Sequence, residues 1–144
     1  MSDLAIAPHN GCPSVPAHPS NANVNANLAS TTAKTIPGAF NGPSNTLGSV
    51  NQWLANVCCW TSAWNYQSQG TQYDDFGNFN YGATGTALGI LSSALMWAGG
   101  LVKNINYWSK GQSNPYSNQP YTNSPQKTNM IAQGIQYAVN GCTN

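Results

Sequence analysis

Residues 83–102 read ATGTALGILSSALMWAGGLV, a run of twenty residues without a charged side chain. As one helix, a run of this length matches a single crossing of a lipid bilayer. Its glycine, serine and threonine residues dilute the hydrophobicity, so the same run also suits a buried helix of a soluble all-α domain. Both interpretations predict a helix here, and they are compatible if the run is buried in one state and meets lipid in another.

Small residues recur at every fourth position of this run and would form a ridge on one side of the helix. The ridge consists of Gly85, Gly89 and Ser93. Such ridges let helix backbones approach each other closely in lipid. Large apolar residues would fall near another face, namely Leu88, Leu91, Leu95 and Val102. The candidates for a membrane or pore surface are therefore the small residues of this region: Gly82, Gly85, Gly89, Ser93, Gly99 and Gly100.

Aromatic and basic residues follow the run directly. They are Lys103, Tyr107, Trp108 and Lys110. Tryptophan, tyrosine and lysine at the end of an apolar segment are typical of an anchor at the membrane–water interface. This pattern favours a membrane-competent segment.

A second helix is expected before this run and a loop between the two. From Val50 to Trp64, apolar and aromatic residues recur at three- and four-residue spacing, and Gly70 would close that helix. Residues 71–81 would then form a loop rich in aromatic side chains.

A third helix is expected near the end of the chain, after a polar loop at residues 109–123. Ser124 is a good N-cap with Pro125 at the first helical position, and Asn140-Gly141 would stop the helix. The predicted fold is thus mainly α, a small single domain of about three main helices with long irregular loops.

The N-terminal third differs from the rest in composition. Residues 1–48 are rich in Pro, Gly, Asn, Ala and Ser and show no sustained period. They are predicted to form an extended, irregular arm, with a short amphipathic piece around residues 24–28. Residues 49–144 would form the folded domain.

Charged residues are scarce in this 144-residue chain. Four Lys and three Asp, without Arg or Glu, make 5% of the sequence and a net charge of +1. In an ordinary soluble domain, roughly a quarter of all residues are charged. Dispersed lysines exclude nucleic acid as a partner, because binding to phosphates needs clustered Lys and Arg. A neutral, hydrogen-bonding surface suits a carbohydrate, a lipid headgroup region or a partner protein.

The four cysteines are Cys12, Cys58, Cys59 and Cys142. Their even number and wide spacing favour two disulfides, with the adjacent cysteines of the middle pairing outwards to the cysteines near each end. No CxxC is present and both histidines lie in the arm, so no metal site and no cofactor are predicted. Residues 1–10 do not read as an export signal, so an unusual route such as injection by a secretion machine is expected.

Asp74 and Asp75 are the candidate catalytic residues. One of them could act as a general acid or base among the neighbouring aromatic rings. Structurally, an acidic pair before Phe-Gly-Asn could instead cap a turn. Consecutive residues in a loop point in different directions, which argues against a matched catalytic pair.

The run YDDFGNFNYGATG at residues 73–85 resembles the core motif of the polymorphic toxin type 44 family. The resemblance extends from about residue 53 to residue 139. It implies that residues 49–144 are a toxin domain deployed against competing bacteria. The chain has Asn123-Ser124 where the family pattern has Asp-Asp, and this departure undermines a hydrolytic scheme with two acidic sites.

Small size, cysteines and an uncharged, glycine-ridged segment also resemble a type VI secretion effector. The expected function is an antibacterial toxin, injected without a signal peptide, that acts from the target periplasm on the inner membrane and forms small ion-conducting pores. The alternative is a peptidoglycan hydrolase that uses Asp75 or Asp74. The expected partners are a cognate immunity protein, a secretion-tube carrier, the target membrane and further copies of the chain in that membrane.

Overall fold

The computed structural model describes residues 11–34, 53–57 and 63–144. This part of the chain is mainly helical and contains no strand, which confirms the predicted fold class. Its α-helices are α1 (Val24–Lys34), α3 (Asp74–Ala87), α4 (Ser92–Ser109) and α5 (Pro125–Val139). Residues 53–57 are also helical. Short 3₁₀ helices lie at η3 (Tyr66–Gln69), η4 (Thr71–Tyr73) and η5 (Pro120–Thr122).

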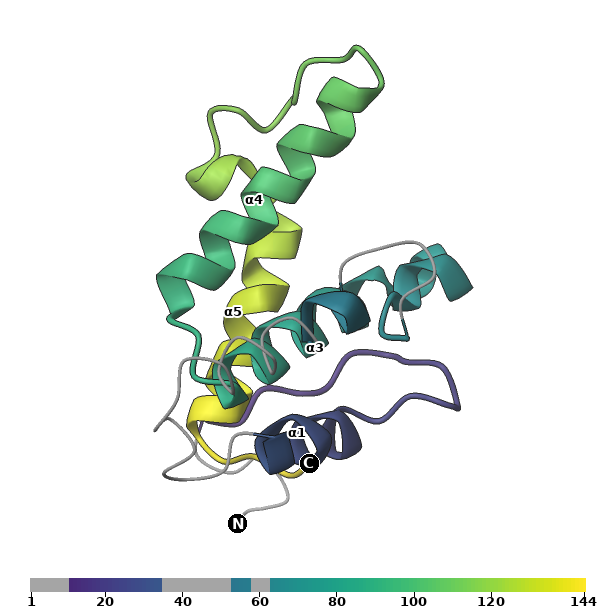
Figure 1. Cartoon of the computed structure of the whole chain (residues 1–144), viewed down its shortest axis with the longest axis vertical. Helices are drawn as coiled ribbons and strands as arrows, with labels where there is room; N and C mark the ends of the chain where they lie inside the picture. The colour runs from purple at the N-terminus through teal and green to yellow at the C-terminus, as the bar shows by residue number, and fades with distance from the viewer. Residues whose placement is uncertain (1–10, 35–52, 58–62) are drawn as a thin grey trace.

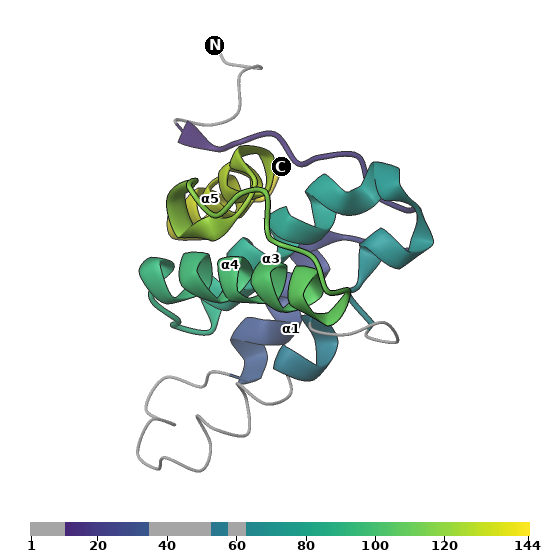
Figure 2. The same cartoon turned by 90° about the horizontal axis from the view of Figure 1, so that it is seen from above.

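The helices are arranged around α3. Figure 1 shows α4 and α5 side by side as an upright pair, with α3 crossing near their lower end and α1 beneath α3. The view from above in Figure 2 confirms that α4 lies beside α5. The core lies where α3 meets α1 and α5. Phe76, Phe79 and Tyr137 are completely buried there, and the rings of Phe79 and Tyr137 meet edge to face at 5.3 Å between centroids.

The crossing of α3 and α5 depends on two glycines. A Cβ atom on Gly82 of α3 would overlap the carbonyl group of Ile131 in α5. A Cβ atom on Gly134 of α5 would in turn overlap the carbonyl group of Phe79 in α3. The two backbones therefore touch at a distance that no larger residue permits.

The run at residues 83–102 is two helices, so the prediction of one continuous helix is wrong. Gly89 has a φ of +92°, a left-handed conformation that glycine adopts without steric cost. The amide of Gly89 donates to the Thr86 carbonyl at 2.9 Å, and that of Ile90 donates to the Gly85 carbonyl at 3.0 Å. These two bonds form a Schellman motif, which ends α3 and lets the chain turn into α4.

The prediction of a loop at residues 71–81 is also wrong. Residues 71–73 form η4, and α3 begins at Asp74. Glycine and asparagine lower the helix propensity of this segment, but its two phenylalanines, Phe76 and Phe79, are completely buried in the core that α3 forms with α1 and α5. Tertiary packing therefore overrides the local preference.

The last helix agrees with its prediction at both ends. The Ser124 hydroxyl accepts from the amide of Lys127 at 3.2 Å, and Pro125 occupies the first helical position. At the other end, the amide of Cys142 donates to the Tyr137 carbonyl at 3.0 Å, closing a second Schellman motif around Gly141.

The helix expected from Val50 to Gly70 is only partly described. Residues 53–57 are helical, Trp64 lies in a turn, and η3 follows. Val50, residues 58–62 and the predicted domain boundary after residue 48 lie outside the described residues. The short amphipathic piece expected around residues 24–28 lies within α1, an eleven-residue helix that runs on to Lys34 in a segment expected to be irregular.

Cys12 forms a disulfide with Cys142, with a Cα–Cα distance of 5.8 Å. The prediction that these two cysteines pair with Cys58 and Cys59 is therefore wrong. Cys58 and Cys59 lie outside the described residues. The reason for the actual pairing is spatial, because residues 11–34 return over the core to the end of α5, where Cys12, Ala22 and Val24 are buried with Tyr137.

Replacing Gly134 by alanine tests the glycine crossing. Gly134→Ala should destabilise the protein by about 3 kcal/mol, because its methyl group must displace the backbone of α3. Gly77→Ala is the matched control, since nothing lies within 4 Å of the added methyl group. It should be neutral or stabilise α3 by about 0.5–1 kcal/mol. Urea unfolding measures both, and equal effects of the two changes would contradict this packing.

Candidate functional site

The glycines predicted to form a membrane or pore surface are mostly packing residues in this structure. Gly82 lies at the α3–α5 crossing, and Gly85 is covered by Leu95 and Trp53. The Tyr121 carbonyl group packs directly against Gly100, and Gly99 lies beside Ile131 and Asn123. Gly89 and Ser93 are exposed. Gly85 and Ser93 lie on different helices, so the ridge expected on one helix is not continuous here.

The most exposed apolar surface lies instead on α4. Trp97 and Trp108 are each 63% exposed, and Leu101 and Ile105 are 54% and 52% exposed. Together with Val102 at 51%, they form what we call the α4 apolar face. Steps of three or four residues separate Trp97, Leu101, Ile105 and Trp108, which places them on one side of the helix. Leu91, just before the first turn, is 73% exposed.

The opposite side of α4 attaches it to the fold. Leu95 is buried with Trp53 and Leu88, and the Tyr81 hydroxyl donates to the Leu95 carbonyl at 2.7 Å. Burial raises the pKa of Tyr81 to about 12. The α4 apolar face is therefore the side of the helix that the other described residues leave exposed.

The second half of α4 is held by η5 in a strained conformation. Tyr121 and Thr122 have φ values of +58° and +53°, in the left-handed region that a β-branched residue rarely adopts. The Asn104 amide donates to the Thr122 hydroxyl at 3.0 Å, and the Asn114 amide donates to the Thr122 carbonyl at 2.8 Å. Such a turn costs about 1–3 kcal/mol, which these contacts offset. As a result, the Tyr121 ring meets Trp97 edge to face at 6.0 Å.

Lys103 lies on the attached side of α4 rather than next to the apolar face. Its ammonium group lies 5.5 Å from the centre of the Tyr116 ring. Burial, followed by repulsion from Lys127, lowers the pKa of Lys103 to about 8, and attraction to Asp74 opposes this only in part. Of the predicted anchor residues, Trp108 and Lys110 are exposed, whereas Lys103 and Tyr107 are half-buried.

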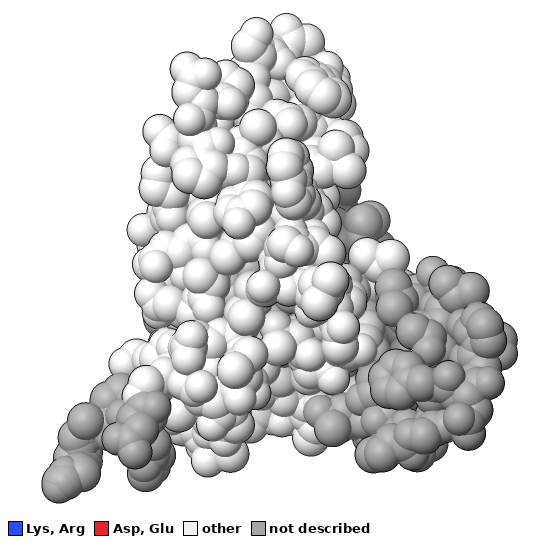
Figure 3. Space-filling view, turned by 90° about the vertical axis from the view of Figure 1, so that its left-hand side faces the viewer, with Lys and Arg blue, Asp and Glu red and all other residues white. Residues whose placement is uncertain are grey.

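Among the described residues, the side of the molecule on which α4 begins shows no charged side chain. Figure 3 shows the left-hand side of Figure 1, and no Lys, Arg, Asp or Glu colour appears there among the described residues. A surface of this kind offers neutral hydrogen-bonding groups and apolar side chains to a ligand.

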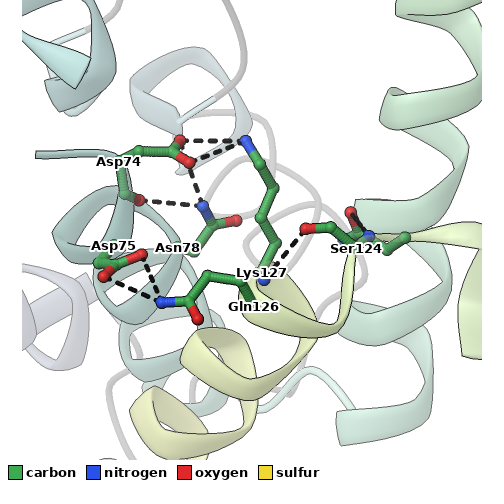
Figure 4. Close-up of polar contacts among 7 residues, drawn as sticks. Asp74, Asp75, Asn78, Ser124, Gln126 and Lys127 are labelled. Carbon is green, nitrogen blue, oxygen red and sulfur yellow. Dashed lines mark hydrogen bonds and ion pairs between the residues drawn. The ribbon is translucent and has the colours of Figure 1, made fainter. Parts of the chain in front are cut away.

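Charged groups gather where α3 and α5 begin, as Figure 4 shows. The Lys127 ammonium forms an ion pair with Asp74 at 3.0 Å, and Asn78 donates to the Asp74 carbonyl at 2.9 Å. The Gln126 amide donates to both carboxylate oxygens of Asp75 at 3.1 Å. We call this group the α3–α5 clasp.

The clasp holds Asp74 and Asp75 with different partners. Each carboxylate binds a separate side chain of α5, and both lie in the first turn of α3, where negative charge is favourable. The expectation that the two carboxylates point in different directions therefore agrees with the contacts. This arrangement joins the N-termini of α3 and α5. It does not place the two carboxylates on either side of one substrate bond, as a glycoside hydrolase requires.

The described residues contain no group of three or more His, Cys, Asp or Glu side chains that could hold a metal ion. Among these residues, no helix combines the length and the hydropathy that crossing a bilayer requires. The α4 apolar face is the surface that the sequence analysis missed. The sequence does contain the pattern, because Trp97, Leu101, Ile105 and Trp108 follow helical spacing. The pattern begins inside the uncharged run at residues 83–102 and continues beyond its end, so the run alone does not show it.

The pKa of Lys103 predicts an increase in stability at alkaline pH. Its folded-state pKa of about 8 lies below the ordinary value of 10.5, so the unfolded chain binds more protons between these values and stability rises with pH. The urea midpoint of the protein should increase from about pH 7 to about pH 10. Lys103→Met should lose this increase, and an unchanged increase in the variant would contradict the assignment.

Comparison with known proteins identifies no relative. No family model matches the chain, and neither a characterised protein nor a solved structure shows significant similarity to it. The resemblance of residues 73–85 to the polymorphic toxin type 44 family stays a prediction.

Proposed function

We propose that this protein is an antibacterial effector that binds the inner membrane of a target cell from the periplasm and makes it permeable to small ions. The observation that supports this proposal is the α4 apolar face, a helix side that is both apolar and uncovered. An isolated patch of this kind on a small protein marks an interaction site.

The α4 apolar face suits the interface of a bilayer better than its interior. A helix that is apolar on one side only lies in the plane of the membrane, with that side among the acyl chains. Tryptophan is enriched at this depth, because its ring is apolar and its N–H group reaches water or headgroups. Trp97 and Trp108 would place the two ends of the face at the same level.

The expected binding is reversible. Complete removal of a large apolar side chain from water contributes about 1.5–3 kcal/mol, and these five side chains are about half exposed. Their transfer into lipid would contribute about 5 kcal/mol in total before the costs of association. Several copies on one membrane would strengthen this binding through avidity.

The proposed toxic step is based on the scarcity of charged side chains in this chain. Copies that gather in the interface would bring Asn, Ser and Thr side chains together, and a path lined by such groups passes small monovalent ions with little charge selection. The target cell would lose its membrane potential while large solutes stay inside. The producing cell would need a membrane-embedded or periplasmic immunity protein, and a carrier would cover the apolar surface before injection.

Substitutions in the α4 apolar face test the membrane contact. The double variant Trp97→Ser and Ile105→Ser should bind vesicles of zwitterionic phospholipid at least about tenfold more weakly, because about 2 kcal/mol of transfer free energy is lost. Cosedimentation with vesicles measures this. Val139→Ser is the control, since Val139 is equally exposed at 66% but lies at the end of α5.

The same experiment separates apolar from electrostatic binding. Since no lysine belongs to the face, raising salt to about 1 M should not weaken the binding. Equal binding of the double variant and the unaltered protein would contradict the proposed surface.

Expression in the bacterial periplasm tests the toxic activity. The unaltered protein should abolish membrane potential and leave the cell wall intact. Asp75→Asn should keep full toxicity, because asparagine can still accept a hydrogen bond from Gln126 and no bond cleavage is involved. Release of cell-wall fragments by the purified protein, and loss of all toxicity in Asp75→Asn, would favour the peptidoglycan hydrolase instead.

A further inference from the structure

Residues 11–34, which we call the strap, cover the core from one side. The strap begins next to the disulfide, passes over the core and ends in α1, which packs on α3 (Figure 1). Beneath it lie the rings of Tyr66, Phe76 and Tyr137, all buried. The His18 ring of the strap lies 5.1 Å from that of Phe76. Removal of the strap would therefore expose aromatic core side chains.

The non-covalent contacts that hold the strap are modest. Its buried apolar side chains in the core are small, namely those of Cys12, Ala22 and Val24, and Val15 and Leu28 pack against the core while partly exposed. Three hydrogen bonds join it to the end of the chain, and all three are exposed to water: Asn140 to the Gly11 carbonyl, Asn144 to the Pro13 carbonyl and Asn25 to the Asn144 carbonyl. Exposed bonds of this kind contribute little net stability.

Stronger polar contacts of the strap lie deeper, in α1. The Asn27 amide donates to the Tyr66 hydroxyl and to the Asn80 side chain, both at 2.9 Å, and the Tyr137 hydroxyl donates to Asn25 at 2.7 Å. These bonds orient α1 correctly once it is in place. Without the disulfide, they must hold an eleven-residue helix that is too short to be stable by itself.

We infer that the Cys12–Cys142 disulfide is a redox-controlled latch that keeps the strap closed over the core in an oxidising compartment and releases it in a reducing one. The bond joins residues 130 positions apart, so it removes a large part of the freedom that the open chain would have. Cys12 and Cys142 are 6% and 7% exposed and belong to the core cluster, so the bond joins the strap directly to the core.

The chemistry of opening is thiol–disulfide exchange with a dithiol reductant. A thiolate of the reductant attacks one sulfur of the bond, which breaks the Cys12–Cys142 bond and forms a mixed disulfide. The second thiol of the reductant then attacks that mixed disulfide. Two electrons and two protons pass to Cys12 and Cys142, which become thiols, and the reductant becomes a disulfide. In the reverse direction, a partner in its disulfide form accepts the two electrons and two protons, becomes a dithiol and closes the latch.

Hydrogen exchange of the full chain, followed by mass spectrometry, tests the latch. In the double variant Cys12→Ser and Cys142→Ser, amide exchange in residues 24–34 should be at least about 100-fold faster than in the unaltered protein. The melting temperature should fall by about 15 °C. Exchange in the middle of α4, which packs on η5 and α5, should stay the same.

A second variant controls for the remaining cysteines. Cys58→Ser with Cys59→Ser retains the latch, so it should resemble the unaltered protein until a dithiol reductant is added and should then exchange like the first variant. The inference is overturned if α1, in both variants under reduction, stays as protected as it is in the oxidised, unaltered protein. It is also overturned if loss of the bond unfolds α3, α4 and α5 together with the strap.

Discussion

The contact between the backbones of α3 and α5 fixes the position of everything else in this protein. Where Gly82 and Gly134 meet the carbonyl groups of the opposite helix, no side chain separates the two elements. This brings Phe79 and Tyr137 together on one side of the crossing. It also sets the angle at which the clasp can join the two helix N-termini. A core built in this way needs few large apolar residues, which suits a chain so rich in small and polar ones.

The scarcity of charge has a complementary effect on the surface. Asp74, Asp75 and Lys127 are engaged between helices, and Lys103 lies over the Tyr116 ring. These four charged groups therefore serve internal contacts, and the described residues show no charge on the face drawn in Figure 3. The α4 apolar face can exist on such a protein because the strained η5 turn holds α4 from behind, at Gly100. Packing on one side of α4 thus determines what its other side can bind.

The sequence predicted those features that depend on local signals. Ser124 and Pro125 mark the beginning of α5, because capping acts within one turn. By contrast, nothing local shows that Gly89 ends a helix rather than belonging to a ridge, since glycine serves both purposes. The segment at residues 71–81 is helical because Phe76 and Phe79 are buried by distant elements. The disulfide partner of Cys12 depends on the path that the strap takes over the core, and the spacing of cysteines in the sequence does not predict that path. For the site, the pattern around residues 97–108 was visible, but only the packing of Leu95 and Gly100 shows which side of α4 faces outward.

The position of the disulfide also changes the topology of the chain. A bond between Cys12 and Cys142 turns almost the entire polypeptide into a covalent ring. A ring cannot be threaded end first through a channel that admits a single extended strand; it must pass doubled over or as a folded body. A channel that admits only a single extended strand could therefore pass this chain in its thiol form alone, whereas the closed protein would need a wider lumen.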